Sequence, residues 1–176
     1  MTNEIKTTAE LLRLSHVSRW SIVQTAVPQT VAEHSWRVWA LVREWSELAA
    51  LTVEEKAWAQ ELALLHDVPE IRTGDCPTPA KTPEMKALLT KAEAEIYPPL
   101  AKLEKEANQC SKDFLKFCDI SEAVIFLQVN GIGKHAKDVQ KLLKKQAEDH
   151  IRSSPLFATD HKENLIKALD KVLAAS

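Results

Sequence analysis

The sequence predicts an all-α protein, a single compact helical bundle that spans residues 1–176. Apolar residues recur at helical spacing through most segments. Only 3 glycines interrupt the chain, and no stretch carries the strand–turn–strand pattern of a β-hairpin. A chain of 176 residues is long enough to bury a core of its own as one domain.

Threonine capping boxes mark the starts of several expected helices. In such a box the threonine side chain accepts the amide hydrogen of a glutamate three residues later, whose side chain reaches back. These boxes predict helices from Thr7, from Thr30 to about Ala50 and from Thr52, and Thr82-Pro83 predicts a fourth start. Residues 15–29 are expected to form a loop or a broken helix. Further helices are expected at 86–106 with a break near 97–99, then around 114–127, 137–153 and 160–175.

Composition excludes several classes of protein. The formal net charge of -2 gives no basic excess, so we expect no nucleic-acid partner. No apolar run is long enough to cross a bilayer, and the N-terminus lacks the features of a signal peptide. The 3 cysteines form no CxxC pair, which is typical of a reduced compartment. We therefore expect a cytoplasmic protein, located in the host cytoplasm if a phage encodes it, without membrane association.

Four residues form a candidate metal site: His34, His66, Asp67 and Asp119. Two imidazole nitrogens and two carboxylates suit a divalent ion such as Zn²⁺, Co²⁺ or Mn²⁺. Each residue is a weak signal alone, because an adjacent His-Asp pair is common by chance. His34 alone suits an ordinary position near a helix start, and Asp119 alone suits a buried acid paired with a neighbouring helix. The prediction therefore depends on the complete set.

Longer motifs surround these residues and carry a family resemblance. They are Arg19-Trp20, the run TVAEHSW over 30–36, the run HDVPEIRTGDCPTPAK over 66–81, and the later Asp119. In this order they resemble the HD-domain nucleotidases of the YfbR type, and within that family the short phage dATP triphosphohydrolases of the DatZ group. The resemblance implies an HD-domain helical bundle and a metal-dependent phosphohydrolase.

The resemblance also implies roles for the polar residues that surround the reacting phosphate of the substrate. His34, His66, Asp67 and Asp119 match the family's metal ligands, with Zn, Co, Mn or Mg as one or two ions. Glu70 matches the residue that positions or deprotonates the attacking water. Asp75 is expected to orient the site or to help a second metal, although it also suits a simple turn residue after Gly74.

Three cations are candidates for binding phosphate. Arg19 offers a planar fork for phosphate oxygens, and Lys81 follows the proline-rich loop. Lys116 lies one helical turn before Asp119, although a solvated surface lysine is an equally good interpretation.

Three further residues are expected around the deoxynucleoside. Trp20 is expected to stack on base or sugar, Ile22 to crowd purines that carry a 2-amino group, and Pro79 to cover the other base face. The alternatives are a core aromatic for Trp20 and a stiffened loop for Pro79.

The predicted function is hydrolysis of dATP to deoxyadenosine and triphosphate, by water attack on the α-phosphorus. The resemblance implies that this reaction removes dATP in phages that use 2-aminoadenine. The alternatives are a deoxyribonucleoside 5'-monophosphatase and a broader dNTP triphosphohydrolase. A nucleotide sensor with a vestigial site is disfavoured, because none of the metal-site motifs is lost. The expected partner is a small-molecule deoxynucleotide, and the resemblance implies a homo-oligomer.

Overall fold

A computed structural model describes residues 3–77 and 81–176 of the chain. The all-α prediction is confirmed: these residues form helices and no β-strand, with only two isolated β-bridges. In chain order the elements are α1 (Thr8–Leu11), the 3-10 helix η1 (Leu12–His16), α2 (Val31–Trp45), α3 (Val53–Leu65), α4 (Glu70–Thr73), α5 (Pro83–Ile96), α6 (Pro98–Glu106), α7 (Gln109–Asn130), α8 (Gly133–Ser153) and α9 (Thr159–Ala175).

The predicted helix starts are confirmed where capping residues mark them. Thr7, Thr30 and Thr52 form complete capping boxes, and Thr82 caps α5 with proline at its first position. The expected end of the second helix near Ala50 is wrong, because α2 ends at Trp45. A turn follows, and Ala50 adopts the left-handed backbone with φ 52. This left-handed residue closes the turn that follows the helix, and it escaped prediction because glycine usually occupies such a position.

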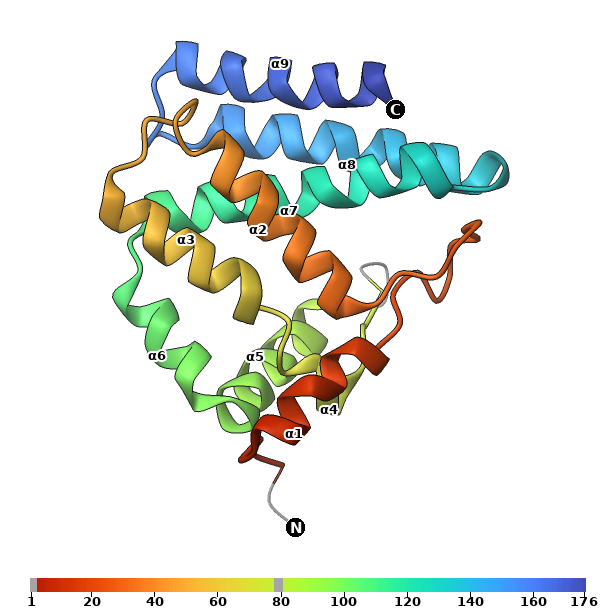
Figure 1. The fold of residues 1–176 in the computed structure, drawn as a ribbon, viewed down its shortest axis with the longest axis vertical. Coiled ribbons are helices and arrows are strands. Elements are labelled where there is room, and N and C mark those ends of the chain that lie inside the picture. Colours follow the sequence, from red (N-terminus) through yellow and green to blue (C-terminus); the bar gives the residue numbers. More distant parts are fainter. Residues whose placement is uncertain (1–2, 78–80) are drawn as a thin grey trace.

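Helix α7 is the central element of the bundle (Figure 1). It lies along α8, which α9 flanks, and it also contacts α2 and α3. The main core joins these helices through buried side chains that include Val38, Leu62, Phe114, Phe117 and Leu165. Since α2, α3 and α7 pack on one another, side chains from three distant segments meet between them.

The segment between η1 and α2 is a loop, which is one of the two predicted alternatives. Isolated bridges join Ser18 to Thr30 and Thr25 to Gly131. In addition, the Ala26 amide donates to the Asn130 carbonyl at 2.8 Å. These contacts attach the loop to the end of α7, which places Arg19 and Trp20 beside that helix.

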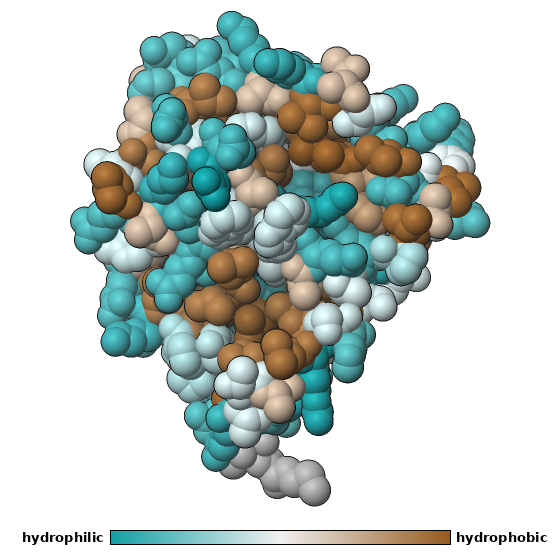
Figure 2. Space-filling model, viewed as in Figure 1, coloured by the Kyte–Doolittle hydropathy of each residue, from teal (hydrophilic) through white to brown (hydrophobic). Residues whose placement is uncertain are grey.

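The surface mixes hydrophilic and apolar side chains, and the apolar ones gather in patches on the face drawn in Figure 2. Within residues 3–77 and 81–176, no helix is long and apolar enough to cross a membrane.

Candidate active site

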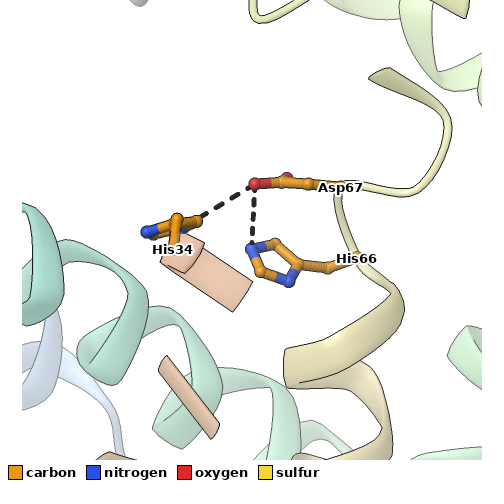
Figure 3. A group of neighbouring side chains, drawn as sticks. All are labelled: His34, His66 and Asp67. Atoms are coloured by element: carbon orange, nitrogen blue, oxygen red, sulfur yellow. Dashed lines mark ion pairs between the residues drawn. The ribbon is translucent and has the colours of Figure 1, made fainter. Parts of the chain in front are cut away.

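His34, His66 and Asp67 meet where α2 approaches the end of α3 (Figure 3). His34 lies near the start of α2 and is fully buried, and His66 is the C-terminal cap of α3. Asp67 Oδ2 lies 3.7 Å from His34 Nε2 and 3.3 Å from His66 Nε2. One ligand atom from each residue lies within 4.8 Å of the others, which is close enough for one ion to contact all three.

Asp119 joins this cluster from α7. Its Oδ1 lies 3.0 Å from His34 Nε2, while its Oδ2 accepts a hydrogen bond from Lys116 Nζ at 2.7 Å. The structure therefore brings together all four residues that the sequence predicts as metal ligands, from α2, the end of α3 and α7.

The two imidazoles are oriented as metal ligands usually are. The second nitrogen, Nδ1, of each ring faces an acceptor: the Ala63 carbonyl for His66 at 3.0 Å, and Glu122 Oε2 for His34 at 2.6 Å. Each Nδ1 therefore holds a proton, and each Nε2 is the nitrogen that faces the cluster and can offer a lone pair to a metal ion. Both Nε2 atoms are buried and make no hydrogen bond among the described residues.

The electrostatics of the cluster favour a cation. Burial and the nearby Arg19 disfavour positive charge on His34, but the carboxylates of Asp119 and Glu122 outweigh them and raise its pKa to about 9. A site that stabilises positive charge inside the fold, with two imidazole lone pairs and two carboxylates, fits a divalent metal ion.

Glu70 lies next to this cluster, at the first position of α4. Its burial, together with repulsion from Asp67 and Asp75, raises its pKa to about 9, while Lys81 and Arg19 act in the opposite direction. These five residues therefore lie within electrostatic range of one another. A carboxyl group with a pKa of about 9 holds a proton near neutral pH, and once ionised it is a stronger base than an ordinary glutamate.

The turn that carries Asp75 follows α4. Gly74 is its C-terminal cap, with φ 71, and its amide donates to the Glu70 carbonyl at 2.8 Å. A positive φ favours glycine at this turn, and Asp75, the next residue, lies close enough to raise the pKa of Glu70.

The three predicted phosphate cations differ in their surroundings. The Arg19 side chain is only 15% exposed, and its Nη1 lies 3.6 Å from Glu122 Oε2 without a hydrogen bond in the described part of the chain. Lys116 is engaged with Asp119, and that negative charge raises the pKa of Lys116. Lys81 is half-buried and acts on the charge of Glu70.

A cavity of about 410 Å³ opens beside two of the predicted ligands. His66 and Asp119 line it, together with Lys112 and Lys116 from α7 and with Glu104 from α6. Two of its lining lysines lie four residues apart on α7, so the cavity has room and positive charge for anionic groups beside the metal cluster.

The residues predicted to contact the base occupy the loop before α2. Trp20 adopts a left-handed backbone with φ 65 and stacks on Phe126, with ring centroids 5.7 Å apart. Ile22 is 53% exposed. Pro79 lies outside the described residues, so its predicted role has no structural counterpart here.

Sequence reasoning missed two residues of the site, Glu122 and Gln29. Both are 2% exposed and are hydrogen-bonded to each other. Glu122 had a detectable signal, because it follows Asp119 by one helical turn within an apolar stretch. Gln29 had none, since it precedes a capping threonine in a polar loop.

Comparisons with known proteins agree with this architecture. The chain is 52% identical over 156 residues to a dATP triphosphohydrolase of Cyanophage S-2L, with 89% of each chain covered. It is 31% identical over 175 residues to a dATP triphosphohydrolase of Salmonella phage PMBT28, which covers 96% of this chain and 90% of the relative.

A solved structure of the Cyanophage S-2L HD phosphohydrolase DatZ, bound to dA and one catalytic Zn²⁺ ion, has the same fold. Its TM-score is 0.95 at 46% identity, covering 98% of this chain and 99% of the other. The family model for 5'-deoxynucleotidase YfbR-like proteins matches residues 6–175. With nearly the whole chain matched, this protein belongs to the YfbR-like family.

Proposed function

We propose that this protein is a metal-dependent phosphohydrolase that converts dATP and water to deoxyadenosine and triphosphate. One observation carries the proposal: His34 and His66 direct buried Nε2 atoms at two carboxylates, beside a half-buried arginine and a cavity lined in part by lysines. The dATP triphosphohydrolases to which the chain is 52% and 31% identical support the choice of substrate.

His34, His66, Asp67 and Asp119 are the proposed metal ligands. Zinc is the first candidate because the DatZ structure contains it, and Co²⁺, Mn²⁺ or Mg²⁺ remain alternatives. A divalent ion held there supplies Lewis-acid chemistry, which polarises a phosphoryl oxygen and makes a nearby water more acidic.

Glu70 is the proposed residue that positions the attacking water and takes its proton. Its raised pKa makes the ionised Glu70 carboxylate a stronger base than an ordinary glutamate, which favours transfer of a proton from water. Asp75 is proposed to act on Glu70 by charge repulsion, since it lies close enough to raise the Glu70 pKa.

In this proposal, different cations bind different phosphates of the substrate. Arg19 and Lys81 bind oxygens of the α-phosphate near Glu70, on which both act electrostatically. Lys116, with Lys112 beyond it, neutralises the β- and γ-phosphates in the 410 Å³ cavity. Glu104 at the edge of that cavity opposes the anionic tail and limits its reach.

Trp20, Ile22 and Pro79 are proposed to face the deoxynucleoside. The strained backbone of Trp20 supports this assignment, because strain of this kind concentrates at functional positions. We further propose that the enzyme acts in the cytoplasm, as a homo-oligomer, and removes dATP during synthesis of genomes that contain 2-aminoadenine.

The second candidate function is a 5'-deoxynucleotidase acting on dAMP, which the family description favours. Both reactions break a bond at the α-phosphorus, so the same metal cluster serves either. Lys112 and Lys116 favour the triphosphate, because a monophosphate leaves no group for the cavity that they line.

A substrate panel tests the proposal. Purified protein is incubated with each dNTP, each NTP and dAMP, with Zn²⁺, Co²⁺ or Mg²⁺, and the products are separated by ion-exchange chromatography. We expect deoxyadenosine and triphosphate in equal amounts from dATP. Phosphate release from dAMP alone would assign the protein as a monophosphatase, and no turnover with any metal would defeat both candidates.

A further inference from the structure

A chain of three short hydrogen bonds connects the loop before α2 to the predicted metal ligand His34. Trp20 Nε1 donates to Gln29 Oε1 at 2.7 Å, and Gln29 Nε2 donates to Glu122 Oε1 at 2.7 Å. The other carboxylate oxygen, Glu122 Oε2, lies 2.6 Å from His34 Nδ1. His34, Gln29 and Glu122 are all buried, so water competes little for these bonds.

The direction of each bond in this chain is fixed by chemistry. An indole N–H only donates, so the Gln29 amide must turn its oxygen to Trp20 and its NH₂ to Glu122. The Glu122 carboxylate only accepts, so the proton on its other side belongs to His34 Nδ1. His34 Nε2 is then the nitrogen that faces the cluster, and on losing its proton it offers a lone pair to a metal ion.

Glu122 keeps its negative charge in this buried position because cations surround it. Arg37 Nη1 lies 3.4 Å from Oε1 and Arg19 Nη1 lies 3.6 Å from Oε2. Two cations, a neutral amide and an imidazole thus face one carboxylate, which is an arrangement able to hold its orientation firmly.

We propose that Glu122 is a positioning residue that fixes His34 as a metal ligand, and that Gln29 sets the orientation of Glu122 from Trp20. The metal site is thereby linked through three side chains to the loop that is proposed to face the deoxynucleoside. This inference rests on the proposed metal site, and it adds two residues that do not themselves touch the ion.

Replacing Glu122 by Gln tests the chain of donors and acceptors without changing its size. The new amide has one NH₂ and one oxygen where the carboxylate had two acceptors. If the new amide oxygen accepts from His34 Nδ1, the new NH₂ faces the NH₂ of Gln29, and two donors oppose each other. If the Gln29 amide rotates to avoid this, its NH₂ faces the Trp20 N–H, which is again a donor opposite a donor. We expect E122Q to bind Zn²⁺ or Co²⁺ about 10- to 100-fold more weakly, measured by competition with a chromogenic chelator.

The exchanged pair Q29E/E122Q restores the donors and acceptors along the chain from Trp20 to His34 and moves the carboxylate to position 29, away from the Arg37 contact. The carboxylate now at position 29 accepts from Trp20 on one oxygen and from the NH₂ of the new amide at position 122 on the other. The oxygen of that amide accepts from His34 Nδ1. We expect this double variant to recover wild-type metal affinity to within about threefold, an estimate set by the ordinary spread of single-interaction effects. The visible absorption of bound Co²⁺ should return to its wild-type shape.

A second variant pair keeps the test decisive if E122Q folds poorly. Removing the indole N–H with W20F lets Gln29 rotate freely, so W20F/E122Q should bind metal more tightly than E122Q. If E122Q is unfolded, W20F/E122Q should be folded and bind metal, and its failure to do either would contradict the inference. E44Q on α2 and Q128E on α7 provide matched controls at exposed positions and should bind metal like the wild type.

The outcomes separate this inference from the proposed function. Metal affinity is measured without nucleotide, so a wild type that binds no divalent ion would defeat the proposed metal site itself. A wild type that binds, with E122Q binding equally well, would overturn only the role of Glu122. A double variant as weak as E122Q would overturn the role of Gln29. A merely structural role predicts a lower unfolding temperature of the E122Q apoprotein with unchanged metal affinity.

Discussion

At the scale of single residues, the site depends on His66 as much as on His34, since each offers one buried Nε2 atom. Replacing His66 by Ala should weaken Zn²⁺ binding more than about 100-fold, because loss even of an indirect partner of a ligand costs 10- to 100-fold. Metal retained after gel filtration, measured by mass spectrometry, reports the change. His135→Ala at an exposed position of α8 is the control, and equal metal content in both variants would contradict the assignment.

Glu70 has a different predicted signature, because it is proposed to act on water rather than to hold the ion. Glu70→Gln should lower kcat for dATP by about 10²- to 10⁴-fold, the usual contribution of a general base, with metal affinity within a few-fold of the wild type. Steady-state kinetics at saturating metal measure this effect, and Glu61→Gln on the exposed side of α3 is the matched control. Full activity in E70Q would remove Glu70 from the mechanism.

Some residues of the site are close together in the sequence and others are far apart, and this separation decides which of them the sequence predicts. His66, Asp67 and Glu70 lie within five residues, so the sequence itself places them together. Gln29 and Glu122 are separated by 93 positions, and only the packing of α7 against the loop before α2 brings them into contact. No local pattern predicts such a pair, although Glu122, a buried acid one turn after Asp119, is expected to need a hydrogen-bonding or charged partner.

At the scale of elements, the N-terminal cap of α3 stabilises the helix whose C-terminal cap is His66. Thr52 accepts from the Glu55 amide, and Glu55 in turn accepts hydrogen bonds from Thr52. Thr52→Ala should reduce the free energy of unfolding by about 1 kcal/mol, the typical cost of losing such a cap. Urea denaturation measures it, with Thr90→Ala at an exposed interior position of α5 as control. An unchanged midpoint in T52A would contradict the assigned role of the cap.

The helix starts were predictable because their determinants are local. A threonine and a glutamate three residues apart specify the first turn wherever they occur. The end of α2 at Trp45 was not predictable in the same way, because no glycine marks it and the left-handed residue of the following turn is Ala50. Tertiary contacts, rather than the local sequence, decide such positions.

At the scale of the whole molecule, acid should loosen the attachment of the N-terminal segment. Glu10 on α1 pairs with Arg72 on α4. A hydrogen bond from the Lys6 amide, and then the pair with Arg72, lower the Glu10 pKa from 4.5 to about 2. A lowered pKa in the folded state stabilises the fold above the unfolded value, and this stabilisation is lost as pH falls from 4.5 towards 2.

Thermal unfolding of the wild type and Glu10→Gln checks this prediction. The wild type should have the higher Tm at neutral pH, and the difference should shrink as pH falls through the interval between 4.5 and about 2. Glu44→Gln at an exposed position of α2 should show no such convergence. A constant difference between wild type and E10Q across this interval would refute the linkage.

The fold as a whole was predictable in class but not in arrangement. Helical periodicity and scarce glycine predicted the all-α bundle, whereas the meeting of α2, α3 and α7 depends on contacts between distant apolar side chains such as Val38, Leu62 and Phe117. That meeting places His34 Nε2 and Asp119 Oδ1 3.0 Å apart although the two residues lie far apart in sequence. The motifs named the site residues, and the packing of the helices explains their convergence.

Hydrolysis of dATP in ¹⁸O-labelled water tests the central claim most directly. Attack of water on the α-phosphorus breaks the bond from phosphorus to the 5' oxygen and places the label on the triphosphate. Mass spectrometry of the products should therefore find ¹⁸O in triphosphate and none in deoxyadenosine. Label in deoxyadenosine, or release of pyrophosphate or phosphate as the first product, would contradict the account.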